Sequence, residues 1–288
     1  MKGKVVVITG ASSGIGKETA VALAAMGATT VMACRNPSKA ESAAEEVRQR
    51  AGSDDVAVVA LDLADLATVG PAAATIAGTY GRVDVLVNNA GGLSGQRRTT
   101  AQGFEQTFGV NHLGHFYLTA LLRSALEAAA PSRVVNVASI AHRLAVGGLP
   151  WDGLQHERHY QGVLVYGQSK LANILFTRGL AARFDPAVVT ANALHPGPVR
   201  TGFGMDGDLK GLLAAGNQLL RLFEISSQSG ADTVIFLSAH PSVAGNSGGY
   251  WYRRHRWRTS REGRDDVVAE RLWTVSEQLL TDAGYPLP

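Results

Sequence analysis

A glycine-rich turn between a strand-like run and a helical pattern constrains the fold of this chain more than any other feature. Residues 5–9 form an unbroken apolar run, which is typical of a strand covered on both faces, and residues 17–26 have the pattern of a helix. Between them, Gly10 permits a tight turn, Gly14 lets the backbone approach a pyrophosphate, and Gly16 allows close helix–strand packing. The helix N-terminus would add N–H donors and a partial positive charge. The turn therefore predicts dinucleotide binding, although three glycines alone are also compatible with a plain turn.

Short β-branched runs alternate with longer helical patterns along the rest of the chain. The expected strands are 5–9, 29–33, 56–61, 83–87, 133–137 and 188–194, and the clearest helices are 17–26, 38–50, 107–128 and 166–184. Gly27 is placed to end the first helix, and Ser38 and Glu41 have capping-box spacing at the start of the second. This rhythm predicts an α/β fold: a Rossmann-type doubly wound parallel sheet in a single domain spanning 1–288. Two stretches, 141–163 and 202–229, interrupt it.

Composition narrows the class of protein. A net charge of +3 is too small to favour nucleic acid, and the single Cys34 excludes an internal disulfide and fits a reducing compartment. No apolar stretch reaches the roughly 18 residues of a membrane span. The first strand-like run begins at Lys4, which leaves no room ahead of it for a signal peptide. We expect a cytoplasmic protein without a membrane anchor.

A tyrosine and a lysine at helical spacing are the strongest chemical signal. Tyr166 and Lys170 lie one helical turn apart and would project from the same face, and Ser139 follows an expected strand. A free tyrosine has a pKa of about 10, which a nearby ammonium group lowers toward neutrality. Reduction of a carbonyl needs a proton donor beside its oxygen, and a serine hydroxyl there can stabilise the developing charge. The pair alone is more often a solvated helix face, but with Ser139 and the glycine turn it predicts hydride-transfer chemistry.

Several motifs occur in an order that resembles the short-chain dehydrogenase/reductase family over nearly the whole chain. They are the Gly-x-x-x-Gly-x-Gly turn, the run Asn-Asn-Ala-Gly ending at Gly91, and the Tyr-x-x-x-Lys pair. Two further runs are similar to the retinol-dehydrogenase-like group: Asn-His-Leu-Gly-His-Phe from Asn111, and Leu-Trp-Thr-Val-Ser-Glu ending at Glu277.

The resemblance implies roles for individual residues. The catalytic residues would be Asn111, Ser139, Tyr166 and Lys170. Lys170 would also bind the nicotinamide ribose, and Asn111 would hold a water molecule in a proton relay. The cofactor-binding residues would be Gly10, Ser12, Ser13, Gly14, Ile15, Gly16, Arg35, Asp62, Leu63, Asn89, Ala90, Gly91, Tyr166, Lys170, Pro196, Gly197, Val199 and Thr201. Family members commonly pair through the helix that carries the tyrosine, so we expect a homo-oligomer.

The end of the second expected strand bears on which nicotinamide cofactor is used. An acidic residue there would bind the ribose hydroxyls of NAD, whereas an arginine accommodates the 2′-phosphate of NADP. The strand ends at Arg35 with no acid, and Lys39 lies close in sequence. A guanidinium fork suits phosphate, so NADP(H) is favoured over NAD(H). Asp62 and Leu63 resemble the pair that contacts adenine, although a solvated turn would also explain them.

The two interrupting stretches would border the substrate. Segment 202–229 is rich in leucine and phenylalanine and lies where the family carries a lid, which would suit a lipophilic substrate; simple packing on the core is an equal alternative. Segment 141–163 contains Trp151, His156, His159 and Tyr160. We interpret the histidines as loop residues and predict no metal, because no carboxylate or cysteine cluster accompanies them. Tyr160 is not expected to be catalytic, because no lysine follows it four residues later.

Residues 250–258 form an aromatic strand that runs into several arginines. This pattern could bind nucleic acid, an anionic lipid surface or an acidic carrier protein, or could protect an edge strand from aggregation. Edge protection is favoured, and no nucleic-acid partner is expected. Alternatively, Trp251 and Trp257 could line the entrance of the substrate pocket.

Together these features predict an NADP(H)-dependent oxidoreductase that interconverts a small hydrophobic aldehyde or ketone and its alcohol by hydride transfer. Three alternatives stay open. The same residues would serve the reduction of a conjugated carbon–carbon double bond, or a tailoring reaction on a natural product. A non-catalytic NADP-sensing protein could use the same fold, although such proteins would be expected to lose the tyrosine or the lysine.

Overall fold

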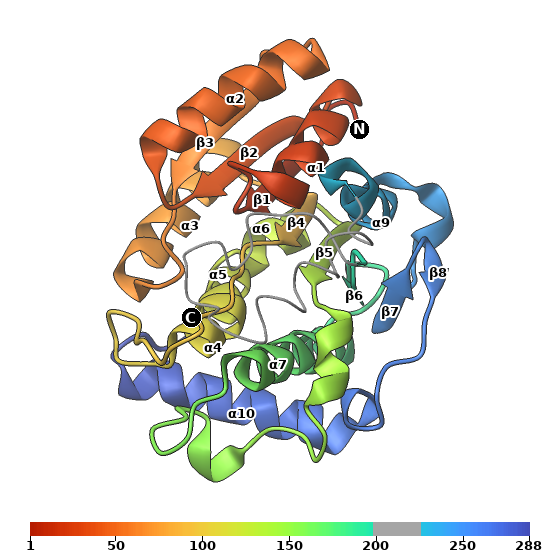
Figure 1. The fold of residues 1–288 in the computed structure, drawn as a ribbon. Helices are drawn as coiled ribbons and strands as arrows, with labels where there is room; N and C mark the ends of the chain where they lie inside the picture. The colour runs from red at the N-terminus through yellow and green to blue at the C-terminus, as the bar shows by residue number, and fades with distance from the viewer. Residues whose placement is uncertain (198–225) are drawn as a thin grey trace.

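The computed structural model describes residues 1–197 and 226–288, and a single sheet runs through them (Figure 1). Its strands are β1 (Val5–Thr9), β2 (Thr29–Cys34), β3 (Val56–Ala60), β4 (Val85–Asn88), β5 (Ser132–Val137), β6 (Val189–Leu194), β7 (Gly249–Tyr252) and β8 (His255–Arg256). They are ordered β3-β2-β1-β4-β5-β6-β7-β8, and every pair is parallel except β7 with β8. The expected single-domain α/β fold with a Rossmann-type doubly wound sheet is confirmed.

Helices cover both faces of the sheet. Their bounds are α1 (Gly14–Ala25), α2 (Pro37–Ala51), α3 (Leu66–Tyr80), α4 (Gln106–Phe108), α5 (Gly114–Leu121), α6 (Arg123–Ala128), α7 (Gly162–Arg183), α9 (Ser227–Ala239) and α10 (Asp266–Asp282). Helices α1, α2 and α9 share one apolar layer with the sheet, whereas α3, α5 and α7 share the other (Figure 1). Strands β1, β4 and β6 are buried along their whole length, as expected of strands covered on both faces.

Helix α10 packs along α7 on the outer side of the second layer (Figure 1). Trp273 of α10 contacts the rings of Phe116 and Phe176, with centroids 4.8 and 5.9 Å away, and Arg183 lies 4.0 Å above its ring. The helix that carries Tyr166 is therefore already covered on this side by the same chain. Pairing of two copies through that helix stays a prediction.

Two expectations about helices are wrong. Asn36, not Ser38, caps α2, since the Asn36 side chain accepts a 2.9 Å hydrogen bond from the Lys39 amide. The expected continuous helix over 107–128 is broken into α4, a π-helical turn at Gly109–Leu113, α5 and α6. At the start of the break Gly109 packs closely against Thr100: a Cβ on Gly109 would lie only 2.5 Å from Cγ2 of Thr100.

The aromatic and arginine-rich segment forms the hairpin β7–β8 at the edge of the sheet. Arg253 and Arg254 make its turn with φ angles of 47° and 65°, in the left-handed region. Trp251 is buried in the layer of α1 and α9, and its indole N–H donates a 3.0 Å bond to Asn192. The hypothesis that Trp251 lines a pocket entrance is therefore wrong.

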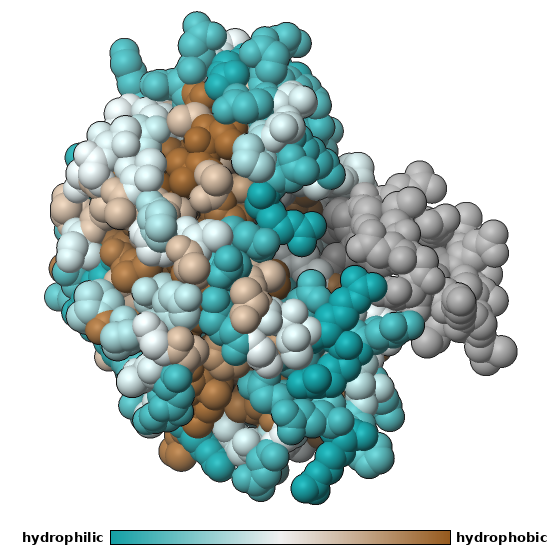
Figure 2. All heavy atoms as spheres, turned by 90° about the vertical axis from the view of Figure 1, so that its left-hand side faces the viewer, coloured by the Kyte–Doolittle hydropathy of each residue, from teal (hydrophilic) through white to brown (hydrophobic). Residues whose placement is uncertain are grey.

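On the side seen in Figure 2, apolar residues outside the grey ones appear in small groups separated by hydrophilic residues. In the part of the chain that the structure describes, no helix is both long enough and apolar enough to cross a membrane.

Candidate active site

A cavity of about 740 Å³ opens at the carboxyl ends of the parallel strands. The strand order reverses between β1 and β4, which is where open α/β sheets bind their ligands. Of the described residues that the sequence assigned to cofactor binding or catalysis, all but Gly16 line this cavity. Val199 and Thr201, together with most of the expected lid at 202–229, lie outside the described residues. Fold closure thus brings together side chains separated by more than a hundred positions in sequence.

The glycine turn has the geometry that its sequence predicts. Gly10 and Gly14 have φ angles of +66° and +56°, and α1 begins at Gly14. A Cβ on Gly10 would lie 2.9 Å from Cα of Ala90, and one on Gly16 would lie 2.6 Å from Nδ2 of Asn89. Gly16 therefore serves close packing behind the cavity. Ser13 precedes α1, and its side chain makes no capping hydrogen bond. The amides in the first turn of α1 are therefore left for another acceptor.

Thr9 ties the ends of β1 and β4 together, a role that the sequence analysis missed. Its hydroxyl accepts hydrogen bonds from the amides of Asn89 and Ala90 at 2.9 and 3.0 Å. The same oxygen lies 2.8 Å from Nε2 of His115, whose Nδ1 lies 3.1 Å from the carbonyl oxygen of Asn111. His115 is buried, and burial lowers its pKa to about 4, so the ring is neutral.

Tyr166 and Lys170 project from α7 toward Ser139, as the spacing predicts. The Lys170 ammonium group lies 5.6 Å from the centroid of the Tyr166 ring and donates a 2.9 Å hydrogen bond to the carbonyl of Val137. Burial raises the pKa of Tyr166 to about 12, against the opposing effect of a hydrogen bond with the Ser139 side chain. Burial also lowers the pKa of Lys170 to about 8. The lysine is therefore mostly charged at neutral pH, whereas the phenol is protonated.

Asn111 lies in the π-helical turn and is fully buried. Its side chain donates to the carbonyl of Gly92 and to the hydroxyl of Ser169, at 3.0 and 2.9 Å, and accepts from the Gly92 amide at 2.9 Å. A Cβ on Gly91 would lie 2.9 Å from Oδ1 of Asn111 and 3.2 Å from Nζ of Lys170. Glycine at this position thus allows the asparagine and the lysine to share one wall of the cavity.

The end of the cavity away from Tyr166 and Lys170 is lined by Arg35, Asn36 and Lys39, all of them exposed. Asp62 also lines the cavity, and one of its carboxylate oxygens accepts a 2.9 Å bond from the Ala64 amide. Arginine and lysine therefore stand at the end of β2, at the position where an acid would favour NAD.

Segment 141–163 does not line this cavity, contrary to expectation. It supports the wall indirectly, because the Tyr160 hydroxyl donates a 3.0 Å bond to the carbonyl of Ser94, which is a lining residue. Across the described ranges 1–197 and 226–288, no group of three or more His, Cys, Asp or Glu side chains is placed to hold a metal ion.

Known proteins resemble the chain over most of its length. A family model described as short chain dehydrogenase matches residues 4–151. The chain is 43% identical to human retinol dehydrogenase 12, over 97% of this chain and 87% of that protein. It is 40% identical to human retinol dehydrogenase 13, over 96% and 85% respectively.

Solved structures share the fold. An uncharacterised protein from Mycobacterium paratuberculosis is 32% identical and superposes with a TM-score of 0.75, covering 100% of this chain and 96% of its own. A 3-ketoacyl-(acyl-carrier-protein) reductase from Brucella melitensis, in complex with NADH, is 25% identical with a TM-score of 0.67, covering 86% and 96%. The fold of this family implies a nicotinamide cofactor, NAD(H) or NADP(H). The chain therefore belongs to the short-chain dehydrogenase/reductase family, in its retinol-dehydrogenase-like group, and is an oxidoreductase acting on carbonyl and alcohol groups.

Proposed function

We propose that this protein is an NADP(H)-dependent oxidoreductase that interconverts a hydrophobic aldehyde or ketone and its alcohol. The observation that carries the proposal is one cavity with two chemically distinct ends. Ser139, Tyr166 and Lys170 lie at one end, and Arg35 and Lys39 lie at the other. The glycine turn lies between them.

The described residues fit a dinucleotide. The left-handed backbone of Gly10 and Gly14 and the open first turn of α1 form a cradle for a pyrophosphate. Arg35 and Lys39 would bind a 2′-phosphate, and no acid at the end of β2 would repel it. Lys170 would hold the nicotinamide ribose. When bound, the nicotinamide supplies or accepts the hydride.

The side chains supply the proton chemistry. In the reductive direction, the Tyr166 hydroxyl would donate a proton to the carbonyl oxygen, and Ser139 would donate a hydrogen bond to the same oxygen. Burial alone makes the phenol a poor acid, because it raises the Tyr166 pKa to about 12. The charged Lys170 would offset this by stabilising the phenolate. Asn111 would position the lysine and hold a water molecule for proton return.

The substrate class rests on the relatives and on the composition of one segment. The similar human proteins are named retinol dehydrogenases, and retinol is a lipophilic alcohol. The leucine-rich segment 202–229, most of which lies outside the described residues, would add apolar surface as a lid. A cytoplasmic location, with a homo-oligomeric assembly, is proposed on the sequence alone.

The proposal is tested by following NADPH and NADH absorbance with a panel of lipophilic aldehydes, ketones and enones. We expect turnover with NADPH, and a fall of about 10²–10⁴-fold in kcat for Tyr166→Phe with NADPH binding intact. Product analysis with the enones separates carbonyl reduction from double-bond reduction. Full activity of Tyr166→Phe would overturn the proposed mechanism. Tight NADPH binding without turnover of any compound would favour the sensing or natural-product alternative.

A further inference from the structure

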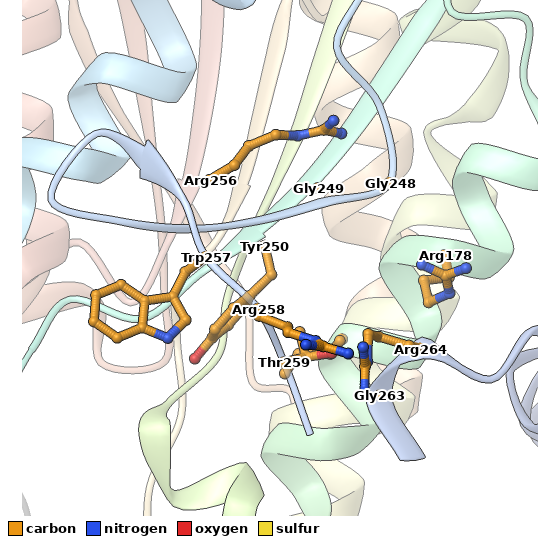
Figure 3. Close-up of a pocket in the computed structure, with 11 residues that line it drawn as sticks. Arg178, Gly248, Gly249, Tyr250, Arg256, Trp257, Arg258, Thr259, Gly263 and Arg264 are labelled. Carbon is orange, nitrogen blue, oxygen red and sulfur yellow. The ribbon is translucent and has the colours of Figure 1, made fainter. Parts of the chain in front are cut away.

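A second cavity, of about 270 Å³, lies beside the β7–β8 hairpin (Figure 3). Its walls come from the hairpin and the chain after it, from α7, and from the helical turn at Glu262–Arg264. It shares no lining residue with the first cavity. Its volume is several times the roughly 30 Å³ share of one water molecule. The cavity is therefore a separate site with room for a small ligand.

Four arginines line this second cavity, and their charges are mostly unbalanced. They are Arg178, Arg256, Arg258 and Arg264. Arg178 pairs with Asp266 at 2.5 Å. Within the described part of the chain, no carboxylate oxygen lies within 4 Å of the other three guanidinium groups. Like charges held around one space repel each other, so an anion placed between them would be stabilised.

The hydrogen-bond donors of these side chains are largely unused. Arg256 reaches the carbonyl of Ser247 at 3.4 Å, and Arg264 reaches the carbonyl of Ser260 at 3.3 Å, both long contacts. For the Arg258 guanidinium, the described residues provide no hydrogen bond. In Figure 3 the Arg258 side chain extends toward Gly263 and Arg264 across the cavity. The free donors of two arginines thus face a common space.

Backbone contacts hold this wall of the cavity in place. The Arg258 carbonyl accepts a 2.6 Å bond from Arg143, and the Ser260 amide donates to Nε2 of His142 at 3.1 Å. The Trp257 amide donates to the Tyr250 carbonyl at 2.7 Å. An ordered wall reduces the entropy lost when a ligand binds.

The hairpin arginines divide into two groups by geometry. Arg253 and Arg254 form the turn and do not line the cavity, and Arg254 pairs with Asp232. They suit the protection of an edge strand. Arg256 and Arg258 instead border the cavity together with Arg264. Edge protection therefore explains only part of the arginine-rich segment.

We propose that this second cavity binds a phosphate-type oxyanion, a diphosphate or a phosphate monoester. Guanidinium groups form bidentate, charge-assisted hydrogen bonds with phosphate oxygens, and several arginines around one cavity match the charge of a multivalent anion. Thr259 and Tyr250 add polar atoms to the lining. The phosphate could belong to a soluble compound or to a lipid headgroup, and both offer the same oxygens.

The test compares two pairs of substitutions that remove the same charge. Arg258→Gln with Arg264→Gln changes the cavity, and Arg253→Gln with Arg261→Gln changes exposed arginines near it that do not line it. Pyrophosphate binding is measured by calorimetry at constant ionic strength. Each titration is repeated with a fixed excess of NADPH present, because pyrophosphate could also enter the first cavity at the glycine turn. Thermal melting confirms that each variant is folded.

We expect the cavity pair to weaken pyrophosphate binding by about tenfold or more and the matched pair to change it by less than about twofold. Co-sedimentation with phosphatidic acid vesicles, against phosphatidylserine vesicles of equal surface charge, then identifies the source. Binding to phosphatidic acid that depends on the cavity pair indicates a headgroup, and its absence with pyrophosphate binding retained indicates a soluble phosphate. Equal weakening by both pairs, or no effect of the cavity pair on either probe, would overturn the proposal.

Discussion

Lys170 donates a 2.9 Å hydrogen bond from Nζ to the carbonyl oxygen of Val137, the last residue of β5. This bond ties α7 to the strand that ends two residues before Ser139. Asn173, one turn further along α7, donates to the same carbonyl at 3.2 Å. The relative placement of Tyr166 and Ser139 is therefore set by a lysine–backbone contact between a helix and a strand.

The buried Lys170 should make the stability of the protein depend on pH above 8. Burial lowers its pKa from an ordinary 10.5 to about 8, so between these values the unfolded chain binds more protons than the folded one. This group alone therefore makes the free energy of unfolding rise with pH, by about 2 kcal/mol from pH 8 to 9.5. Urea unfolding of wild type and Lys170→Met at pH 7.5, 8.5 and 9.5 measures it. Parallel pH profiles for the two proteins would contradict the expected titration.

Gly91 and Gly92 offer a matched pair of substitutions. Gly91→Ala would place a Cβ 2.9 Å from Oδ1 of Asn111 and 3.2 Å from Nζ of Lys170, whereas a Cβ on Gly92 meets nothing within 4 Å. We expect Gly91→Ala to lower kcat by about 10- to 100-fold, because displacement of these groups by a fraction of an ångström disturbs the reacting geometry. Gly92→Ala should keep near wild-type kcat. Steady-state kinetics decide the matter, and equal effects of the two changes would show that the close approach is unimportant.

Arg35 should control the choice between the two nicotinamide cofactors. Its guanidinium group lines the cavity at the end of β2, where a 2′-phosphate would lie. We expect Arg35→Gln to lower kcat/KM for NADPH by about tenfold or more and to leave the value for NADH within about twofold. Arg123→Gln, an exposed arginine on α6, serves as the control. A parallel fall for both cofactors would assign Arg35 a structural role instead.

His115 should contribute to loss of stability in acid. Burial lowers its pKa from an ordinary 6.5 to about 4, so between these values the unfolded chain binds more protons and the folded state loses stability as pH falls. For this group the loss from pH 6.5 to 5 is about 2 kcal/mol. His115→Gln should flatten the profile by about that amount in urea unfolding at pH 7, 6 and 5. If the free energy of unfolding kept the same dependence on pH in His115→Gln, the His115 ring would bind protons equally in the folded and unfolded states between pH 7 and 5.

Much of the fold could be predicted because local patterns carried it. Strands β1, β5 and β6 lie within one residue of their expected bounds, because short runs rich in valine and other β-branched or apolar residues favour strands. The break at Gly109–Leu113 was not predictable, because it accompanies a close contact of Gly109 with Thr100 in the preceding loop, which helical periodicity does not record. Asparagine and serine both serve as N-caps, so residue type alone did not distinguish Asn36, which caps α2, from Ser38.

The candidate site divides in the same way. The sequence by itself determined which residues could do the chemistry. Tyr166 and Lys170 share one helix face because they are four residues apart, and the glycines of the turn lie together because they are close in sequence. Only the tertiary structure decided that Thr9 ties β1 to the end of β4 and contacts His115, and that Arg258 and Arg264 face a second cavity. These contacts join residues far apart in sequence, and their energies depend on distances that no local pattern encodes. Spacing along one element is a property of the sequence, whereas contact between elements exists only once the chain has packed.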